Sequence, residues 1–294
     1  MEKIRLGVIG LSKGNGHPYS WSAICNGFDD QYMQECPFPV IPQYLTAARG
    51  TQDFIENAEV THIWTQERSI SEHVAKASCI AHVVDRPEDM IGQVDAVLLA
   101  RDDAENHLAM ARPFLEAGLM VYIDKPLAFD RLTAEKIYAM EQFEGQIFSC
   151  SAMRYARELD ELDLLDIGKI SYIDATTMKR WDTYAAHIID PVLRIVGDTH
   201  RVVSSAALKN ENTQGETLQL EDGTIVSLHA HKTTPVPISL RIIGDKGERV
   251  VTFNDTFYAF RGALRAFIAS VQAKKSVLSK AHVMTLVDWI ERGL

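Results

Sequence analysis

Cysteine is scarce in this 294-residue chain, and its cysteines form no metal-ligand or close disulfide pattern. The four are Cys25, Cys36, Cys79 and Cys150. We therefore expect reduced thiols and a cytoplasmic protein. No apolar run approaches the roughly 20 residues that cross a bilayer, so a role at a membrane would require a partner.

Basic residues are also in the minority. Thirty Lys and Arg oppose forty Asp and Glu, and the net charge of -10 makes bulk attraction to nucleic acid or anionic membranes unfavourable. Ten prolines and 17 glycines are too few for a long flexible linker. The hydrophobic share of 46% and the charged share of 24% are ordinary for globular proteins. We expect two packed domains, residues 1–150 and 151–294.

The first half of the chain predicts a doubly wound α/β domain. Its longest apolar runs are uninterrupted, which is typical of parallel strands buried on both faces. Segments with helical spacing separate them, as in residues 104–117, where Gly118 stands at a helix C-terminus. A capping box at Ser69–Glu72 predicts the start of another helix, and Asp130 predicts a cap for a helix to about residue 142. The expected strands are residues 4–9, 60–64, 81–84, 94–100, 120–123 and 146–150.

Two other segments depart from that alternation. Residues 29–59 are much longer than the usual connection and contain three prolines, so we interpret them as an insertion in the first domain. After residue 150, turn signals separate a series of short strands, which predicts an α+β domain on an open, mainly antiparallel sheet. Its expected helices are residues 158–165, 184–196, 257–273 and 280–291. Its expected strands are residues 169–177, 201–208, 216–220, 224–231, 238–243 and 249–253.

A glycine-rich turn follows the first expected strand, where backbone N–H groups can face a phosphate. The usual dinucleotide spacing would place glycines at 10, 12 and 15, but the chain has Gly10, Ser12, Asn15 and Gly16. The Ser12 hydroxyl and the Lys13 ammonium are candidate phosphate ligands, and Gly14 and Gly16 give the turn its freedom. A tight turn with no ligand is the alternative.

The second expected strand should be followed by an acidic residue for the adenosine ribose. Glu67 is a candidate, whereas Arg68 would suit a ribose 2′-phosphate, so NAD and NADP both remain open. Lys125 follows another buried strand at the carboxyl edge of the sheet. Its ammonium can polarise a carbonyl or stabilise an alkoxide during hydride transfer, and a salt bridge with Asp124 is the alternative.

Together these segments resemble the glucose-fructose oxidoreductase and inositol dehydrogenase family (Gfo/Idh/MocA). The resemblance implies a Rossmann domain, a C-terminal sheet used for substrate binding and homodimer or homotetramer formation, and NAD(P)-linked oxidation or reduction of sugars or polyols. Asp124 stands where the family usually has Glu. The segments that carry the resemblance are the turn at residues 6–16, Asp95–Ala100, His107, Phe114–Gly118, Asp124–Ala128, Arg154–Tyr155 and His187–Asp190.

The resemblance also assigns catalytic candidates. Lys125 matches the lysine beside nicotinamide and substrate, and His187 matches the histidine of the family's D-x-x-x-H pair. The Asp of that pair is missing, because Thr183 stands four residues before His187 and Asp182 five. Tyr184 is an alternative proton donor, and Asp190 is an alternative group to orient the imidazole.

The remaining candidates are less specific. His107 is aligned with the family, while Arg101 either pairs with Asp102 or Asp103 or faces the cofactor pyrophosphate. Substrate candidates are Arg154, Tyr155, Thr183, Lys125 and His187. His229 and His231 share one face of a strand, but no third ligand accompanies them, so we expect no metal. A binding protein that has lost turnover and an NAD-assisted hydrolase remain alternatives to a dehydrogenase.

Overall fold

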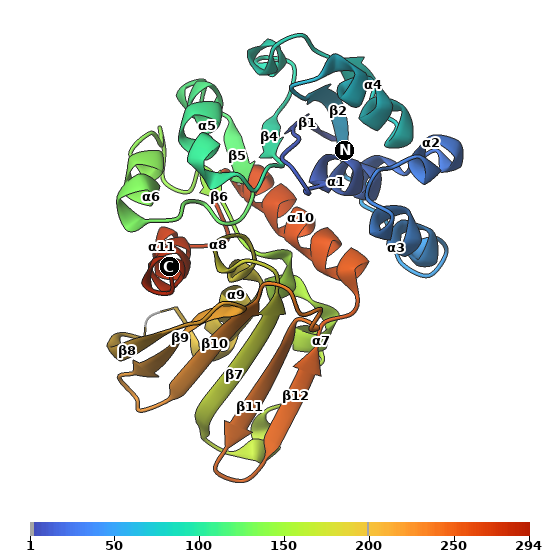
Figure 1. Ribbon diagram of the computed structural model, residues 1–294. Helices are drawn as coiled ribbons and strands as arrows, with labels where there is room; N and C mark the ends of the chain where they lie inside the picture. The colour runs from blue at the N-terminus through green and yellow to red at the C-terminus, as the bar shows by residue number, and fades with distance from the viewer. Residues whose placement is uncertain (1–2, 199) are drawn as a thin grey trace. The chain divides into compact units, whose positions relative to one another are not determined.

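The computed structural model describes residues 3–198 and 200–294, and its chain divides into two compact units (Figure 1). The first unit contains the described residues up to Leu127 together with Glu135–Ser149 and Phe260–Leu278. The second contains Ala128–Ala134, Cys150–Ala259 and Ser279–Leu294. The single boundary at residue 150 stays a prediction, and it is simpler than this division into units of several segments. Within the described residues, no helix is both long and apolar enough to cross a membrane.

The first unit is built on a six-stranded parallel sheet in the order β3-β2-β1-β4-β5-β6, which confirms the predicted doubly wound fold. Strands β4 and β5 are buried along their whole length, as continuous apolar runs require. The strands are β1 Ile4–Ile9, β2 Ala58–Trp64, β3 His82–Val83, β4 Ala96–Leu99, β5 Met120–Ile123 and β6 Ile147–Phe148. In the ladder, Ile9 is paired with Leu99 and Leu99 with Ile123, so three strands end at one level. The segments that follow them meet at this edge.

Helices flank this sheet. Helices α1 and α4 contact β2, and α5 contacts β4 and β5. Gly118, directly after α5, has the positive φ of 79° expected of a helix-terminating glycine. The helices are α1 His17–Asn26, α2 Asp30–Gln34, α3 Val40–Ala48, α4 Arg68–Ala77, α5 His107–Glu116, α6 Arg131–Tyr138 and α10 Thr256–Ala273, of which α6 and α10 run between segments of the two units.

The capping box at Ser69–Glu72 was wrong. Helix α4 begins two residues earlier than such a box requires, at Arg68, and its N-cap residue Glu67 makes no side-chain capping bond. The Ser71 hydroxyl instead accepts a hydrogen bond from the Thr65 N–H at 2.8 Å, which ties the end of β2 to the helix. Helix α6 also ends at Tyr138, short of the expected residue 142.

The interpreted insertion folds into the two helices α2 and α3. It packs beside the glycine-rich turn, because a Cβ added to Gly16 would lie 2.5 Å from Cδ1 of Ile41 and 2.6 Å from Cδ2 of Phe38. A larger residue at position 16 would therefore displace the Ile41 and Phe38 side chains. The insertion therefore forms one wall of the turn.

The second unit is built on a mixed six-stranded sheet in the order β12-β11-β7-β10-β9-β8. Strands β7 and β10 are parallel and every other adjacent pair is antiparallel, which confirms the predicted mainly antiparallel sheet. The strands are β7 Ile170–Met178, β8 Val202–Lys209, β9 Thr213–Leu220, β10 Ile225–His231, β11 Ser239–Gly244 and β12 Glu248–Thr252.

One face of this sheet forms the core of the second unit. Helix α9 (Ala186–Val196) contacts β7, and α11 (Lys280–Arg292) contacts α9. Trp181, in α8 (Trp181–Tyr184), is buried and donates from its indole nitrogen to the Ile290 carbonyl at 2.8 Å. This bond fixes the end of α11 against the start of the segment that carries His187.

The predicted helix at 158–165 was wrong. Helix α7 covers only Arg157–Asp160, and a 3-10 turn follows at Leu165–Ile167. The Asp163 carboxylate accepts a hydrogen bond from the Leu165 N–H at 2.9 Å. Such a local side-chain bond competes with helix continuation.

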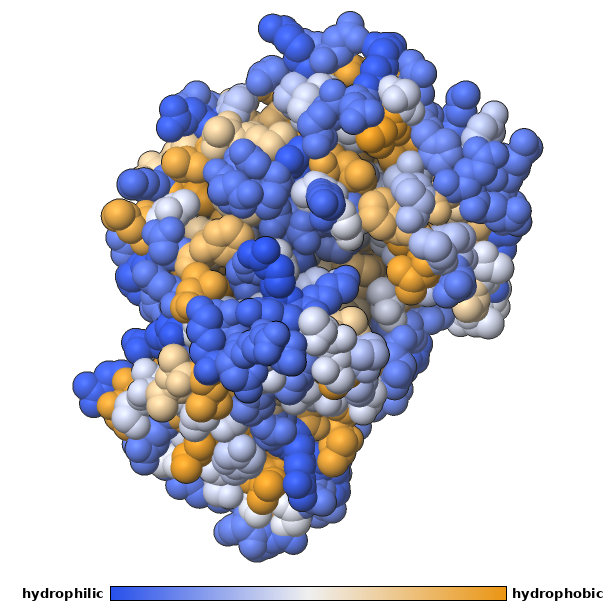
Figure 2. Space-filling model, viewed as in Figure 1, coloured by the Kyte–Doolittle hydropathy of each residue, from blue (hydrophilic) through white to orange (hydrophobic). Residues whose placement is uncertain are grey.

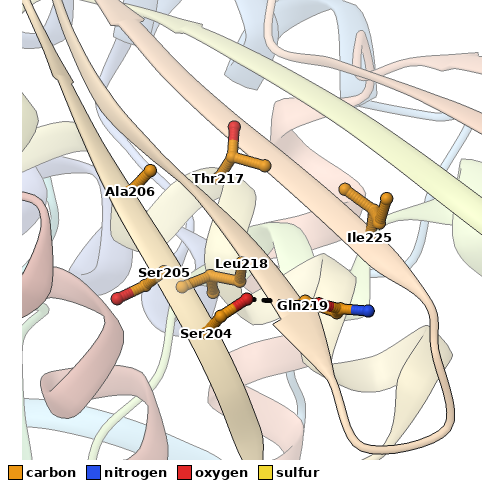
Figure 3. Close-up of a pocket in the computed structure, with 7 residues that line it drawn as sticks. All are labelled: Ser204, Ser205, Ala206, Thr217, Leu218, Gln219 and Ile225. Atoms are coloured by element: carbon orange, nitrogen blue, oxygen red, sulfur yellow. Dashed lines mark hydrogen bonds between the residues drawn. The ribbon is translucent and has the colours of Figure 1, made fainter.

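The opposite face of the second sheet keeps apolar residues at the surface. Ile225 is 39% exposed and Val250 is 65% exposed. Ile225, Thr217 and Gln219 lie around a pocket of about 230 Å³ on strands β8 to β10 (Figure 3). Elsewhere, exposed apolar residues are scattered among hydrophilic ones, as Figure 2 shows for one side of the molecule.

Candidate active site

The glycine-rich turn has a backbone that leaves room for a ligand. A Cβ at Gly10 would lie 2.2 Å from Cγ of Pro18, so glycine lets α1 approach the end of β1 closely. Gly14 has a φ of +84° and no atom within 4 Å of an added Cβ. Among the described residues, no hydrogen bond is made by the N–H groups of Lys13 and Gly14. The turn therefore fits a phosphate group on its open side.

Ser12 connects this turn to Lys125 through an acidic residue. The Ser12 hydroxyl donates to Oδ1 of Asp102 at 2.5 Å, and Oδ2 of Asp102 lies 3.5 Å from Nζ of Lys125. Lys125 is 3% exposed at the carboxyl end of β5. The ammonium thus pairs with Asp102, whereas Asp124, the partner considered from the sequence, accepts a hydrogen bond from the Lys125 backbone N–H at 2.8 Å. The contact with Asp102 holds the ammonium at the sheet edge where the turn lies.

Asp124 is a second connection between the same elements. It is buried, and its Oδ2 accepts from Nδ2 of Asn15 at 2.8 Å and lies 2.5 Å from Nδ1 of His17. Burial opposes its ionisation, but the charges of His17 and Lys125 and the bonds from His17 and Asn15 outweigh burial and hold the pKa of Asp124 well below its usual range. Asp124 is therefore a carboxylate at neutral pH.

Sequence reasoning did not assign functional roles to Asn15, His17 and Asp102. Asn15 stands where the usual spacing has a third glycine, and His17 follows Gly16 directly. These two positions could have indicated a role, because polar side chains at the N-terminus of a helix often hydrogen-bond to a neighbouring group. The His17 ring also stacks on Trp21, with ring centroids 4.8 Å apart.

Arg101 and His107 have protein partners in the structure. The Arg101 guanidinium pairs with Asp103, which decides between the two aspartates that the sequence left open. His107 is fully buried, with Nε2 2.8 Å from the Arg101 carbonyl and Nδ1 3.0 Å from the Leu127 carbonyl. His107 thus connects the segments after β4 and β5, and it contacts no open surface.

Three polar side chains follow the end of β2, and each makes different contacts. Gln66 donates to and accepts from the backbone of Leu11, at 2.5 and 2.7 Å, and so supports the glycine-rich turn. Arg68 binds Glu72 at 3.0 Å and also pairs with Asp85. Glu67 precedes α4 and makes no capping bond with its side chain.

In the second unit, the residues before His187 pair with their own neighbours. Asp182 forms an ion pair with Arg180, and the hydroxyl of Tyr184 accepts a hydrogen bond from Lys179. The Tyr184 and His187 rings meet edge to face, with centroids 5.0 Å apart. Thr183 lies in α8 between Asp182 and Tyr184. Of the proton-donor candidates, the structure thus brings Tyr184 against His187.

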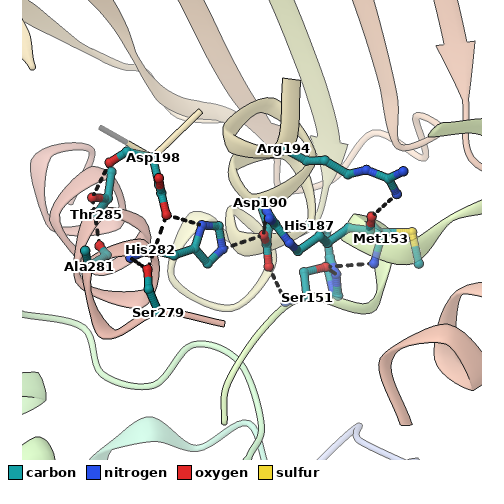
Figure 4. A network of polar contacts seen from close by, with 11 residues as sticks. Ser151, Met153, His187, Asp190, Arg194, Asp198, Ser279, Ala281, His282 and Thr285 are labelled. Carbon is teal, nitrogen blue, oxygen red and sulfur yellow. Dashed lines mark hydrogen bonds and ion pairs between the residues drawn. The ribbon is translucent and has the colours of Figure 1, made fainter. Parts of the chain in front are cut away.

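A serine occupies the position beside the His187 ring. Oγ of Ser151 lies 2.8 Å from Nδ1 of His187 (Figure 4). Asp190 accepts from the Ser151 N–H at 2.7 Å, and its other oxygen lies 3.3 Å from Nη1 of Arg154. Burial raises the pKa of the neighbouring Tyr155 well above its usual range, so its phenol stays protonated. Sequence reasoning missed Ser151.

His229 and His231 make separate contacts. Nε2 of His229 lies 3.1 Å from Asp174, and Nδ1 of His231 lies 3.2 Å from the Thr213 hydroxyl. In the parts of the chain that the structure describes, no group of three or more His, Cys, Asp or Glu side chains could hold a metal ion.

Residues 4–151 match the sequence profile of a family described as "Oxidoreductase family, NAD-binding Rossmann fold" (GFO_IDH_MocA). This is half of the chain. The chain belongs to this oxidoreductase family. The match covers the glycine-rich turn, Lys125 and Ser151, so the turn geometry above is that of an NAD-binding Rossmann domain. No curated protein sequence matches the chain significantly.

Solved structures share the fold of this family member along its length. A myo-inositol dehydrogenase from Lactobacillus casei, in complex with NAD(H) and myo-inositol, superposes with a TM-score of 0.72 at 16% identity, covering 99% of this chain and 93% of that one. A myo-inositol 2-dehydrogenase from Lactobacillus plantarum gives 0.71 at 16%, covering 99% and 96%. The UDP-N-acetylglucosamine 3-dehydrogenase GnnA from Acidithiobacillus ferrooxidans gives 0.70 at 15%, covering 99% and 97%. At these identities the likeness shows the fold alone.

Proposed function

We propose that this family member is an NAD-dependent dehydrogenase or reductase that acts on a CH–OH group of a sugar, sugar derivative or polyol. The observation that carries the proposal is the buried Lys125 at the carboxyl edge of β5, joined through Asp102 to the glycine-rich turn of an NAD-binding family. A ligand in the turn and a substrate at Lys125 would share one sheet edge, which is where open α/β sheets bind ligands.

Different residues of the chain would bind the cofactor and act on the substrate. Gly10, Ser12, Lys13, Gly14 and Gly16 would hold the dinucleotide phosphates. The bound nicotinamide supplies the hydride chemistry. Lys125 would polarise the oxygen at the reacting carbon, since a positioned ammonium stabilises developing negative charge.

His187 is the proposed proton-transfer group of the second unit, with Tyr184 against its ring. Arg154, Tyr155 and Thr183 are the proposed substrate-binding residues. Asp182 is the weakest of the catalytic candidates, because Arg180 already neutralises it.

The contacts of Arg68 favour NAD over NADP. Its guanidinium is neutralised by Glu72 and Asp85, and Glu67 adds a third carboxylate after β2. A 2′-phosphate would meet these acidic groups, whereas ribose hydroxyls can donate to a carboxylate. Arg101 is less suited to the pyrophosphate than the sequence suggested, because it is paired with Asp103.

The first test is binding of NAD, NADH, NADP and NADPH by calorimetry, followed by a screen of inositols, free sugars and nucleotide-linked sugars for NAD reduction. We expect NAD or NADH to bind and one substrate class to turn over. With that substrate, Lys125→Ala and His187→Ala should each lower kcat by roughly 10²-fold or more. The exposed Lys136→Ala is the matched control. Wild-type turnover in both active-site variants would refute the proposal.

A binding protein on the same scaffold is the second candidate. It is favoured by one observation: the ring of His187 has a serine beside Nδ1, and Thr183 stands where the family's pair has its Asp. Tight NAD binding with no NAD reduction by any compound in the screen would support it. Release of a hydrolysis product with no net change in NAD would instead support an NAD-assisted hydrolase.

We also propose a homodimer or homotetramer formed through the exposed face of the second sheet. Its support is the apolar surface at Ile225 and Val250. Light scattering should give a multiple of the 32.9 kDa chain, and Val250→Lys should lower it. A cytoplasmic location remains a prediction from cysteine usage.

A further inference from the structure

A chain of polar contacts in the second unit runs from helix α11 to His187 (Figure 4). Its first member is His282, in the first turn of α11, whose Nε2 lies 2.9 Å from Oδ1 of Asp190. The Nδ1 of His282 lies 3.8 Å from Asp198, which also accepts from the Ser279 hydroxyl at 3.4 Å. His282 is buried, and sequence analysis gave it no role.

Asp190 is the centre of this network. It is fully buried, and burying a carboxylate is costly unless donors replace its water. Here His282, Arg154 and the N–H of Ser151 provide three donors. If the His282 donor is lost, two of these three donors remain, so we expect Asp190 to shift toward Arg154 and the Ser151 N–H.

Ser151 transmits the position of Asp190 to His187. Its N–H is held by Asp190, and its Oγ accepts a hydrogen bond from the Met153 N–H at 3.2 Å. A hydroxyl has one proton to donate, and within the described residues the acceptor beside this oxygen is Nδ1 of His187 at 2.8 Å. When Ser151 donates to Nδ1, the neutral His187 ring must carry its proton on Nε2.

We propose that His282 is a positioning residue for His187, acting through Asp190 and Ser151 to keep the neutral His187 ring protonated on Nε2. This inference rests on the proposed role of His187 for its functional meaning. A ring in the Nε2–H form offers an N–H donor that can polarise a substrate carbonyl, which suits its reduction. In the oxidation direction, Nδ1 must carry the proton instead, and Ser151 can then accept from it because a hydroxyl both donates and accepts.

Nitrogen NMR of histidine side chains tests the proposal without any substrate. The chain has ten histidines, and His187→Gln identifies the resonances of His187 in protein labelled with ¹⁵N-histidine. At a pH where the ring is neutral, we expect a protonated Nε2 and an unprotonated Nδ1 in the wild type. Ser151→Ala should give a mixture of the two tautomers. His229, which pairs with Asp174, serves as the internal reference and should not move.

Two substitutions at His282 separate hydrogen bonding from packing. His282→Gln keeps an N–H donor near the position of Nε2, whereas His282→Leu fills similar space without a donor. We expect the Nε2–H tautomer to persist in His282→Gln and to be lost in His282→Leu. If His282→Leu does not fold, His282→Asn replaces it, because its shorter side chain does not reach Asp190. Equal effects of the Gln and the non-donor variant, or no change in either, would overturn the proposal.

Kinetics with a substrate from the screen provide the second measurement. His282→Leu should lower kcat about tenfold with KM little changed, since small displacements of a catalytic group cost this much or more. His282→Gln should restore most of the rate, and His229→Leu is the matched control. Wild-type rates in His187→Ala would refute the proposed role of His187, whereas a slow His187→Ala with an unaffected His282→Leu would refute the positioning role alone.

Discussion

Replacing Glu216 by Gln should stabilise the protein, and the gain should grow with pH. Glu216 lies on β9 with 1% of its surface exposed, opposite Leu228 of the neighbouring strand. Neither of its carboxyl oxygens has a hydrogen-bond partner in the described residues. Burial raises its pKa from 4.5 to about 8, and the charge of Arg292 offsets only part of the shift.

The sign and size follow from proton linkage. Below pH 4.5 the folded and unfolded chains both keep the Glu216 proton, so no penalty applies. Between pH 4.5 and 8 the unfolded chain loses the proton while the folded one retains it, and the free energy of unfolding falls as pH rises. The full shift corresponds to a loss of about 5 kcal/mol above pH 8, at about 1.4 kcal/mol for each pH unit. Glutamine has no proton to lose, so Glu216→Gln escapes this loss.

Denaturant unfolding at pH 4.5 and pH 9 measures the effect. We expect the difference between Glu216→Gln and the wild type to increase by several kcal/mol from the lower to the higher pH, with about 5 kcal/mol as the upper limit. Tryptophan emission is a suitable signal because Trp181 and Trp289 are both buried in the second unit. The exposed Glu211→Gln is the control and should show no such change. A difference that is the same at both pH values would show that Glu216 is ionised in the folded protein, and the reasoning would be wrong.

Two further predictions concern the first unit. Asp124→Asn should lower the thermal midpoint at pH 7, because the depressed pKa of Asp124 means that its carboxylate stabilises the fold. This stabilisation is lost as pH falls below about 4, so the midpoints of the variant and the wild type should converge in acid. A constant difference between the two midpoints across a pH series would contradict the assignment. Gly10→Ala should lower the free energy of unfolding by about 1–3 kcal/mol through its clash with Pro18 and should also weaken NAD binding. Gly14→Ala should lower the free energy of unfolding by only about 1–2 kcal/mol, through its positive φ. Denaturation and calorimetry of both variants measure these effects, and equal losses in the two would count against the close approach at Gly10.

The sheet of the first unit was predictable because parallel strands that are buried on both faces have continuous apolar sequences. Residues 120–123 are such a run, and the strand they form places Lys125 at the sheet edge, as expected. The partners of Lys125 and Asp124 were not predictable. Asn15 and Asp124 are 109 residues apart, and their contact depends on the register that aligns β1, β4 and β5.

The same limit applies to the second unit. The strands of its sheet follow from turn signals, and His187 was found through a family resemblance. Ser151 and His282 carry no local pattern that points to His187, since the bonds from Ser151 to His187 and from His282 to Asp190 span 36 and 92 residues. Local rules also failed where side chains had competing partners, as at Glu72 of the expected capping box, which pairs with Arg68, and Asp163, which binds Leu165.

The contact between Gly16 and the insertion changes the meaning of the glycine pattern. In the usual fingerprint, each glycine is explained by the turn, by the ligand or by the sheet. Here the space above Gly16 is filled by Phe38 and Ile41, which belong to the insertion. Shortening residues 29–59 would therefore relax the demand for glycine at position 16, and a family member without this segment is free to carry a larger residue there. The glycine at position 16 is thus required by the packing of the insertion against the turn.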